Sequence, residues 1–567
     1  MAQPFWHFSS SAPLSVFSMA AQWQQRRFNR QLPQAQTIQA RFLQTLLKEQ
    51  QGTALGQALK LDRVTNLEEF QQQVPRWNYD GYAPYFERAA AGESNVVSPL
   101  PVQVFNMSSG STGSRKLVPI TKRVQQTRAY ANQVAMGYAF DQAQSMGHRV
   151  GQLLLTTLIT PLGKTNAGNI TYGHVSGNQL RTTPSFVFSQ LFAQPYDALL
   201  ISDTAARNYV CLLFGLQQER LTYLAANFPL IMLQLCAYLE RFGPALVDDI
   251  GRGGISPEIA LEPALRQKLQ AMLSPQPQRA QQLQTLLKRH GRLLPRHVWP
   301  HLVFLITARG GPSDFYFERF GEYFGDTPVF GGTYSSSEAV FGSYHQLNSD
   351  EAILALKTNF FEFIAPDQWG QDTPKTLLPH QLQVGEYYRV LVTNYSGFCR
   401  YDIGDVLQVI GMRQGVPMIV FRYRQGGTLS AISEKTTEHH VTQAMAVLQT
   451  DFLPIEDFCV TLSESLVEPY YLLNVELTQE TKLSDPKEFL HAFDRQMQWA
   501  NESYAIKRQK NDITVPQLNI LAAGSFKQLR QRRLKPGVVD DAQVKLAHIS
   551  CDRNFLDGIT ITHQIRC

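Results

Sequence analysis

The sequence predicts an α/β protein with a large N-terminal domain and a smaller C-terminal one. Short apolar runs alternate with longer helical patterns, such as residues 221–242, over most of the chain. A second succession of strands and helices begins after a polar, glycine-containing stretch at residues 422–435. With 567 residues, of which 44% are hydrophobic, the chain is long enough to form several cores.

An amphipathic helix is predicted near the start of the chain. Five apolar residues recur there at the spacing that buries one helix stripe, so they should belong to the core: Ile38, Phe42, Leu43, Leu46 and Leu47. Residues 102–107 are predicted to form a strand, because an extended apolar run follows two prolines. Further apolar runs at residues 153–159, 198–201 and 302–307 are expected to be strands of the same domain.

The rest of the chain divides into a helical segment and a C-terminal α/β pattern. Two helices joined by a surface turn are expected at residues 265–296, without a domain boundary. The C-terminal pattern comprises a helix at 441–448, an amphipathic helix carrying Phe489, Phe493 and Met497, and strands near 459–462, 470–477 and 517–522. We therefore predict domains at residues 1–423 and 424–567, the second of a usual size for a small domain.

Composition indicates a soluble protein of the reducing cytoplasm. Lys plus Arg exceed Asp plus Glu by only 52 to 47, so neither a nucleic acid nor a membrane is indicated as a partner. The densest basic cluster is expected to be a solvated helix face: Lys527, Arg530, Arg532, Arg533 and Lys535. The six cysteines show no paired spacing. No signal peptide is predicted, and no apolar run approaches the roughly 20 residues that span a bilayer.

A loop rich in hydroxyls and glycine follows the strand at 102–107. It consists of Ser108, Ser109, Gly110, Ser111, Thr112, Gly113, Ser114, Arg115 and Lys116. Glycines allow successive backbone N–H groups to converge, and hydroxyls and a lysine add donors, so the loop can hold a phosphate. It is not a Walker A motif, because two residues separate Gly113 from Lys116 and a leucine follows. Taken alone, its composition fits a flexible linker equally well.

Two further polar segments interrupt apolar surroundings. Residues 331–338 combine glycines and serines with Tyr334, whose ring can stack on a base, and Glu338, whose carboxylate can hold a hard cation such as Mg²⁺. Residues 401–405 place Asp405 after a glycine at the start of a strand, where it can accept hydrogen bonds from a ribose. Taken alone, the first fits a glycine-rich turn with a solvated carboxylate and the second a Gly-Asp hairpin turn.

In their order along the chain, these three segments resemble the nucleotide motifs of the adenylate-forming superfamily. More closely, they resemble those of the auxin-responsive Gretchen Hagen family of acyl-acid amido synthetases. The resemblance extends over most of the chain, through Val74-Pro75, Tyr79, Gly92-Glu93, Leu294-Pro295, Trp299-Pro300 and Gly397-Phe398 to Arg400-Tyr401. It implies a large N-terminal α/β domain of adenylate-forming type and a smaller, mobile C-terminal α/β domain joined by a hinge.

The resemblance also implies a ligase that forms a carbon–nitrogen bond in two steps. ATP would activate a carboxylic acid as an acyl-adenylate with release of pyrophosphate, and the amine of an amino acid would then displace AMP. ATP and Mg²⁺ are the implied cofactors, with Glu338 as metal ligand and catalytic residue and Lys545 as the catalytic lysine. The implied nucleotide-binding residues are Ser108, Ser109, Gly110, Ser111, Thr112, Gly113, Lys116, Tyr334, Ser337, Asp405 and Arg424.

The sequence departs from the family's pattern in two of the motifs. Ser111 and Thr112 exchange the hydroxyl types of the first motif without losing a donor. Asp402 adds a carboxylate to the third motif, which puts the electrostatics near the nucleotide in doubt. Arg424 and Lys435 match the hinge region more loosely than the motifs match theirs.

Two other functions stay open at this point. A ligase with a thiol acceptor, either coenzyme A or a protein, shares the first step, and a nucleotide-binding protein without turnover shares the binding residues. Neither a zinc site nor a hydrolase site is predicted, because prolines break the helix that His297 and His301 would need and no nucleophile elbow is present. Four aromatic residues suit either an acyl pocket or the core: Tyr130, Tyr138, Phe186 and Phe188. The acid, the acceptor and the oligomeric state are left open, a monomer being compatible.

Overall fold

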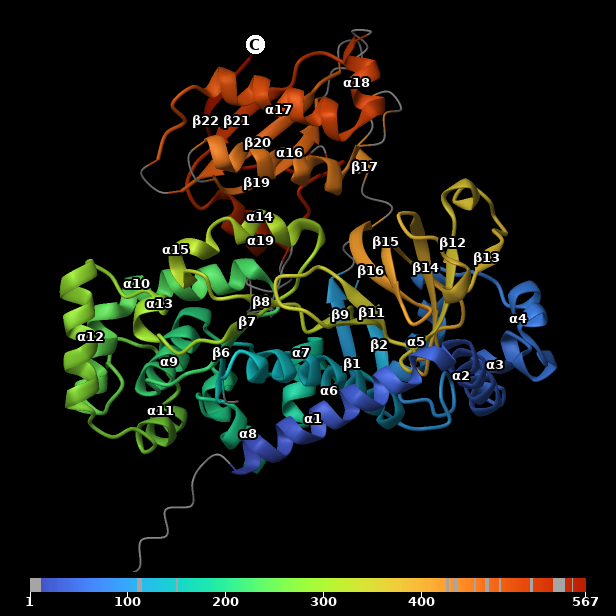
Figure 1. Cartoon of the computed structure of the whole chain (residues 1–567), viewed down its shortest axis with the longest axis horizontal. Helices are drawn as coiled ribbons and strands as arrows, with labels where there is room; N and C mark the ends of the chain where they lie inside the picture. Colours follow the sequence, from blue (N-terminus) through green and yellow to red (C-terminus); the bar gives the residue numbers. More distant parts are fainter. Residues whose placement is uncertain are drawn as a thin grey trace, which may run out of the picture. The chain divides into compact units, whose positions relative to one another are not determined.

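A computed structural model describes most of the chain (Figure 1). The described residues are 12–109, 115–148, 151–424, 428–429, 431, 434, 436–452, 455–463, 469–478, 481–509, 513–533, 546–552 and 554–566. The chain divides into two compact units. The first contains the described residues of Met1–Arg309, Gly321–Ile403 and Gln408–Val420, and the second those of Gly310–Phe320, Gly404–Leu407 and Phe421–Cys567. The second unit thus recruits two short segments from before the predicted boundary at residue 423.

One sheet of the first unit is parallel, which is the signature of an α/β fold. Its order is β3-β6-β7-β8, with bounds Leu153–Leu155, Tyr223–Ala225, Phe304–Ile306 and Val329–Phe330. The prediction of a helix over 221–242 is partly wrong, because β6 occupies its start and helix α10 begins only at Pro229. Proline has no amide hydrogen and therefore suits the first helical position. The strand expected at 198–201 is also wrong, since Tyr196–Leu200 form a 3₁₀ helix.

A second sheet of the first unit has the order β2-β1-β5-β4. Its strands are β1 (Val102–Ser109), β2 (Arg115–Thr121), β4 (Gly163–Lys164) and β5 (Thr171–Gly173). β1 pairs antiparallel with β2 and parallel with β5. The predicted strand at 102–107 is therefore confirmed and extends to Ser109.

The largest sheet has the order β13-β12-β14-β15-β16-β11-β10-β9. Its strands, in chain order, are Thr333–Ser335, Val340–Tyr344, Ala352–Leu354, Phe360–Ile364, Thr376–Leu377, Tyr387–Thr393, Tyr401–Arg413 and Val416–Arg424, from β9 to β16. β15 includes residues 401–405, so the hairpin turn considered there is wrong. Gly404 has a φ of +80° within this strand, which explains why a glycine stands where the sequence suggested a turn.

The longer helices of the first unit follow the hydrophobic pattern of the sequence. They are α1 (Ala12–Gln31), α2 (Ala35–Gln50), α5 (Tyr79–Ala90), α6 (Lys122–Ser145), α9 (Thr204–Gln217), α10 (Pro229–Arg252) and α12 (Pro277–His290). Shorter ones are α3 (Ala54–Ala58), α4 (Leu67–Gln73), α7 (Val175–Arg181), α8 (Ser185–Leu191), α11 (Pro263–Gln270), α13 (Pro295–Val298) and α15 (Phe320–Phe324). The two helices predicted at 265–296 are confirmed as α11 and α12. The predicted stripe of α2 is buried except for Ile38, which lines a cavity described below.

Helix α10 is long and apolar enough to cross a membrane by length and composition, with a mean hydropathy of 1.3. The expectation that no segment qualifies is therefore wrong by this measure. In the structure the helix packs against α9 and α12 (Figure 1), and 44% of its most apolar stretch is buried. Its Asp249 accepts a hydrogen bond of 2.5 Å from the Tyr209 hydroxyl. These are the contacts of a helix packed inside the first unit.

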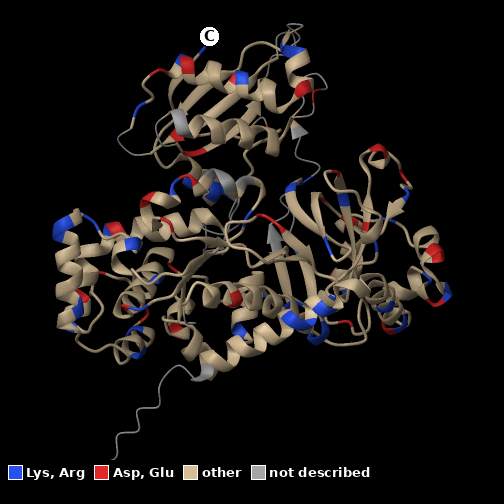
Figure 2. Ribbon diagram, in the orientation of Figure 1, with Lys and Arg blue, Asp and Glu red and all other residues tan. Residues whose placement is uncertain are grey.

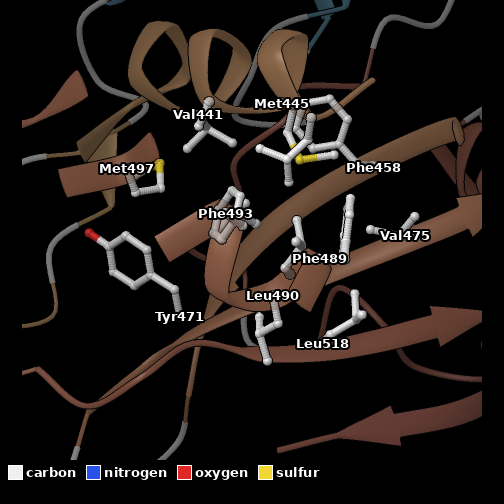
Figure 3. Close-up of a cluster of buried hydrophobic side chains, with 14 of the residues drawn as sticks. Val441, Met445, Phe458, Tyr471, Val475, Phe489, Leu490, Phe493, Met497 and Leu518 are labelled. Atoms are coloured by element: carbon white, nitrogen blue, oxygen red, sulfur yellow. The ribbon is translucent and has the colours of Figure 1, made fainter. Parts of the chain in front are cut away.

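The second unit contains a mixed sheet of the order β19-β20-β21-β22. Its strands are Ile455–Leu462, Tyr471–Leu477, Gln517–Leu521 and Ile561–Ile565, and its helices are α14 (Asp314–Phe317), α16 (Glu438–Asp451), α17 (Pro486–Ala500), α18 (Glu502–Gln509) and α19 (Ser525–Arg533). Two short strands, β17 (Thr428–Leu429) and β18 (Thr436–Thr437), pair separately. Every helix and strand predicted beyond residue 435 is confirmed, and side chains from α16, α17 and the sheet point toward one another in the core (Figure 3).

The predicted solvated face of α19 needs one correction. Lys527 and Arg532 are exposed as expected, whereas Arg530 is buried and donates a hydrogen bond of 2.8 Å to Asp457 on β19. Helical spacing identified the helix but could not show which arginine has a carboxylate opposite it. Lys535 lies outside the described residues.

Candidate functional site

The first motif begins at the end of β1, where the chain connects to β2. Ser108 and Ser109 are the last residues of β1, and Ser109 pairs with Arg115 at the start of β2. The predicted phosphate-binding residues Gly110, Ser111, Thr112 and Gly113 fall outside the described residues. The Lys116 ammonium lies 5.3 Å from the centre of the Tyr79 ring, within the range of a cation–π interaction. The hairpin thus presents this motif at the end of a paired strand.

The second motif forms the connection between β9 and β10, in which Ser335 pairs with Val340. A side chain at Gly331 would come within 2.4 Å of the Tyr344 ring, so only glycine fits that close approach. The ring of Tyr334 stacks on Phe341 with centroids 4.7 Å apart. That packing fixes the plane of the ring predicted to contact adenine.

A buried arginine from α6 holds this connection in place. The Arg128 Nη2 atom donates hydrogen bonds to the carbonyl oxygens of Ser336 at 3.0 Å and Ser337 at 2.6 Å. The Ser336 hydroxyl in turn accepts the backbone N–H groups of Glu338 and Ala339, both at 3.2 Å. Burial lowers the pKa of Arg128 to about 10, while the negative charge of Glu338 acts in the opposite direction. The arginine therefore remains charged at neutral pH.

The first and second motifs meet at the end of β1. The Ser337 hydroxyl lies 3.5 Å from the carbonyl oxygen of Met107, the residue before Ser108. The side-chain amide of Asn106 lies 3.5 Å from the Ser337 carbonyl oxygen. Residues more than two hundred positions apart are thus neighbours, and the turn that carries Glu338 lies beside the strand that ends in Ser108-Ser109.

Glu338 is the acidic residue of this meeting point. It is 4% exposed, and within the part of the chain that the structure describes its carboxylate makes no hydrogen bond or ion pair. Its carbonyl oxygen accepts a hydrogen bond of 3.0 Å from Asn394. Tyr79 is close enough for the negative charge of Glu338 to add to burial in raising the pKa of the tyrosine to about 12. A buried, unpaired carboxylate of this kind fits the oxygen ligands that Mg²⁺ prefers.

The third motif begins in a tightly anchored loop. Arg400 has a φ of +57°, unusual for a residue other than glycine, and its side chain is buried. Its guanidinium pairs with Glu362 at 3.1 Å and donates to the carbonyl oxygens of Gln71 and Val74 at 2.6 and 2.8 Å. Because Asn394 stands at the other end of this loop, the same loop also contacts Glu338.

The extra carboxylate of the third motif is balanced by two arginines. Asp402 forms ion pairs with Arg76 at 2.9 Å and with Arg389 at 3.2 Å. The sequence raised doubt about the charge of Asp402, and in the structure two arginines of the first unit pair with that carboxylate.

Asp405 and Arg424, both predicted to bind the nucleotide, belong to the second unit and contact each other. Asp405 is 1% exposed, and its Oδ1 atom accepts a hydrogen bond of 2.6 Å from Arg424 Nε. The Arg424 side chain is half exposed. The two residues come from the neighbouring strands β15 and β16, which explains why residues 19 positions apart form a pair.

The predicted lysines Lys435 and Lys545 lie outside the described residues. Residues 548 and 549, just after Lys545, contact β19 of the second unit. Ile549 forms a parallel bridge with Val460, and the Val460 N–H group donates to the His548 carbonyl oxygen at 2.8 Å.

The four aromatic residues proposed for an acyl pocket do not form a group. Phe188 is buried and stacks on Phe192 at 4.4 Å, whereas Phe186 is 66% exposed. Tyr138 is buried and its hydroxyl is hydrogen-bonded to Asn29. Tyr130 lines a cavity described below. The sequence could not separate pocket from core here, because both are apolar.

Three consecutive family models match this chain. The GH3 family N-terminal domain matches residues 24–329, the GH3 family central domain residues 352–424, and the GH3 family C-terminal domain residues 436–554. The chain belongs to the GH3 family. The resemblance inferred from the three motifs is therefore confirmed.

Curated relatives of this GH3 chain are amido synthetases. It is 27% identical over 458 residues to the indole-3-acetic acid-amido synthetase GH3.8 of Oryza sativa subsp. indica, covering 78% of this chain and 75% of the relative. It is 24% identical over 511 residues to the jasmonoyl-L-amino acid synthetase JAR4 of Nicotiana attenuata, covering 87% of each. A third relative is the 4-substituted benzoates-glutamate ligase GH3.12 of Arabidopsis thaliana, 25% identical over 80% of each chain.

Solved structures share the fold of this GH3 chain. The GH3.15 acyl acid amido synthetase superposes with a TM-score of 0.80 at 19% identity, covering 100% of this chain and 98% of the other. A 2-hydroxyisobutyryl-CoA ligase superposes with a TM-score of 0.52 at 12% identity, covering 92% and 90%. The predicted adenylate-forming α/β fold, with a larger N-terminal and a smaller C-terminal domain, is thus confirmed.

Sequence reasoning missed two residues that build this site. Arg128 holds the carbonyl groups before Glu338, and Asn394 holds the carbonyl group of Glu338 itself. Neither belongs to a short motif. The one available signal is position, since Asn394 precedes the third motif by six residues in a glycine-containing loop.

Proposed function

We propose that this GH3 chain is an ATP-dependent acyl-acid amido synthetase that joins a small carboxylic acid to an amino acid. The observation that carries the proposal is the contact between Ser337 and the end of β1, which brings the buried carboxylate of Glu338 next to the first motif. The names of the curated relatives support the reaction class. The identity of this chain to them is too low to transfer a particular acid.

In the first step, a carboxylate oxygen of the acid attacks the α-phosphorus of ATP. The bond to the bridging oxygen breaks, pyrophosphate leaves, and an acyl-adenylate forms. The backbone N–H groups and hydroxyls of residues 108–113 hold the outer phosphates, and Tyr334 and Asp405 orient the adenine and the ribose. Holding the reacting atoms together in this way can lower a barrier by about 7–11 kcal/mol.

Glu338 is the residue that would hold Mg²⁺, and the ion would neutralise charge that develops on the phosphates. Arg128 and Asn394 fix the main chain on both sides of this carboxylate. Because both contacts are made to main-chain carbonyl oxygens, they set the position of Glu338 and leave its carboxylate without a hydrogen-bond partner. The carboxylate is thereby kept available for the metal.

In the second step, the amine nitrogen of the acceptor attacks the acyl carbon. The bond between that carbon and the phosphate oxygen breaks, AMP leaves, and the amine loses its proton to solvent. We assign Lys545 to contact the α-phosphate region in the first step, with the second unit turning about a hinge near Arg424. Lys545→Ala should then slow acyl-adenylate formation while binding of the amino acid is unchanged.

A two-stage screen tests the proposed function. Carboxylic acids, including indole-3-acetate, jasmonate and 4-substituted benzoates, are incubated with ATP and Mg²⁺, and AMP release is measured. Acids that stimulate release are then supplied with each amino acid, and with coenzyme A in a parallel arm, and the products are identified by mass.

The expected product is an amide whose mass equals acid plus amino acid minus water. A thioester formed only with coenzyme A would replace the proposed acceptor class. If no acid in the panel stimulated release of AMP and pyrophosphate, the proposed activation chemistry would be wrong.

A further inference from the structure

The first unit contains a cavity of about 380 Å³ that is separate from the candidate site. Helices α1, α2 and α6 and two loops of the large sheet line it, through Gln31, Gln34, Ile38, Arg41, Phe42, Thr45, Arg123, Gln126, Thr127, Tyr130, Lys357 and Tyr395. The four residues from α6 recur at helical spacing and form one stripe. Arg128, which contacts the candidate site, lies on a different face of the same helix.

Positive charge predominates in this cavity. Arg41, Arg123 and Lys357 line it, and among the described residues the only ion pair these three make is that of Arg123 with Glu49, at 3.6 Å. Arg27 lies close enough to join burial in lowering the pKa of Lys357. Figure 2 shows further Lys and Arg positions over the C-terminal half of α1. Such a group of cations, with one carboxylate among them, favours an anion.

Three polar atoms of the cavity lining are buried and make no hydrogen bond within the described structure. They are Arg123 Nε, Tyr130 Oη and Gln31 Oε1. Burial raises the pKa of Tyr130 to about 12, so its hydroxyl keeps its proton and can donate. A buried donor without a partner costs free energy, and an anion in the cavity would satisfy both the guanidinium and the phenol.

Aromatic rings form the walls between these charges. The Lys357 ammonium lies 5.4 Å from the centre of the Tyr130 ring, and the Arg123 guanidinium 4.8 Å from that of Tyr395. Phe42 packs edge-on against Tyr395, with centroids 5.1 Å apart. Rings held in this way offer flat apolar surfaces beside the cations. The cavity volume falls in the range that small-molecule sites occupy.

We propose that this cavity binds a small organic anion that carries a carboxylate or phosphate on a flat apolar group. Arg123 and Lys357 bind the anionic group together with the Tyr130 hydroxyl, and the rings of Phe42 and Tyr395 contact the apolar part. An aliphatic residue of the predicted core stripe, Ile38, completes the apolar wall, which explains why it alone of that stripe is not buried.

Calorimetric titration of the full chain tests this site. The probes are 1-naphthyl phosphate and 1-naphthoate, with inorganic phosphate and neutral 1-naphthol for comparison. The double variant Arg123→Gln/Lys357→Gln should bind both aryl anions about tenfold or more weakly, because two charge-assisted contacts are lost. The matched control Lys288→Gln/Arg289→Gln removes two exposed cations of α12 outside the cavity and should leave affinity unchanged.

A variant that lacks one oxygen atom distinguishes an effect on ligand binding from an effect on folding. Tyr130→Phe removes only the hydroxyl, so it should weaken binding of the aryl anions several-fold while thermal unfolding of the variant stays at the wild-type temperature. The proposal is overturned if neither aryl anion binds at about 1 mM, or if the double variant binds them as tightly as the wild type. Equal affinity for inorganic phosphate or for 1-naphthol would overturn the assigned class of ligand.

Discussion

Glu338 and Glu362 are buried carboxylates of the same unit, and their surroundings are opposite. Glu362 is 1% exposed and is held by Arg400 at 3.1 Å, Thr376 at 2.6 Å and Gln71 at 3.3 Å. Glu338 is 4% exposed, and its carboxylate has no such partner among the described residues. A buried charge is costly unless it is paired, so removing a partner of Glu362 should destabilise the fold, whereas under the proposed function the unpaired carboxylate of Glu338 is available for a metal ion.

The largest effect on stability is expected at the paired carboxylate. Glu362→Ala leaves the Arg400 guanidinium buried without its partner, which should lower the free energy of unfolding by about 3–5 kcal/mol. Urea denaturation followed by circular dichroism measures this loss. Glu488→Gln, which removes an exposed partner of Arg495, is the control and should leave the midpoint unchanged. A small loss for Glu362→Ala would show that the pairing is not what stabilises the third motif.

Removing the charge of Glu338, the unpaired carboxylate, should have a large effect on activity and a small effect on stability. Glu338→Gln keeps the shape of the side chain and removes its charge, so AMP formation should fall about 100-fold to 1,000-fold while the urea midpoint stays the same or rises. Glu258→Gln, an exposed carboxylate of the first unit, is the matched control. Retained activity in Glu338→Gln would remove Glu338 from the metal site.

The difference between these two residues could not be predicted from the sequence. The motifs predict a functional role for Glu338, but the partners of Glu362 lie at positions 71, 376 and 400, and such pairing exists only in the folded chain. Arg128 and Asn394 were missed for the same reason. No sequence pattern around Arg128 or Asn394 predicts that these residues contact the turn at residues 336–338.

The fold was predicted best where long, strongly patterned segments determine it. Helix α17 and strands β19 to β21 were identified correctly, because their apolar residues recur over seven or more positions or alternate clearly. Strand β6 was merged into α10, because three residues are too few to show a period. The strand at 401–405 was mistaken for a possible turn, since Gly404 carries the same signal in a strand as in a turn.

A moderate effect on both stability and activity is expected at Asn394, which contacts the main chain of Glu338. Its amide donates to the Glu338 carbonyl oxygen and to Asn359 Oδ1, both at 3.0 Å. Asn394→Ala should lower the free energy of unfolding by about 1–3 kcal/mol and lower kcat about tenfold, because Glu338 loses its fixed position. Asn474→Ala, a buried amide of the second unit, is the control for the structural cost alone. Equal kinetic losses in the two variants would contradict a positioning role.

The smallest expected effect is on the pH dependence of stability. It concerns His548, a buried histidine of the second unit that lies between two carboxylates. Burial acts to lower the pKa of His548, but Asp457 and Glu438, 3.6 and 3.4 Å from its ring nitrogens, outweigh burial and raise it. Because the folded pKa lies above the unfolded value of about 6.5, the stabilisation is complete below that pH and is lost as pH rises through the folded pKa.

The free energy of unfolding should therefore fall with rising pH in the wild type, and His548→Gln should remove that slope. His563→Gln, which changes an exposed histidine of β22, should retain it. Urea denaturation at a series of pH values measures the slope in all three proteins. A wild type with the same slope as His548→Gln would show that the two carboxylates do not hold a proton on this ring.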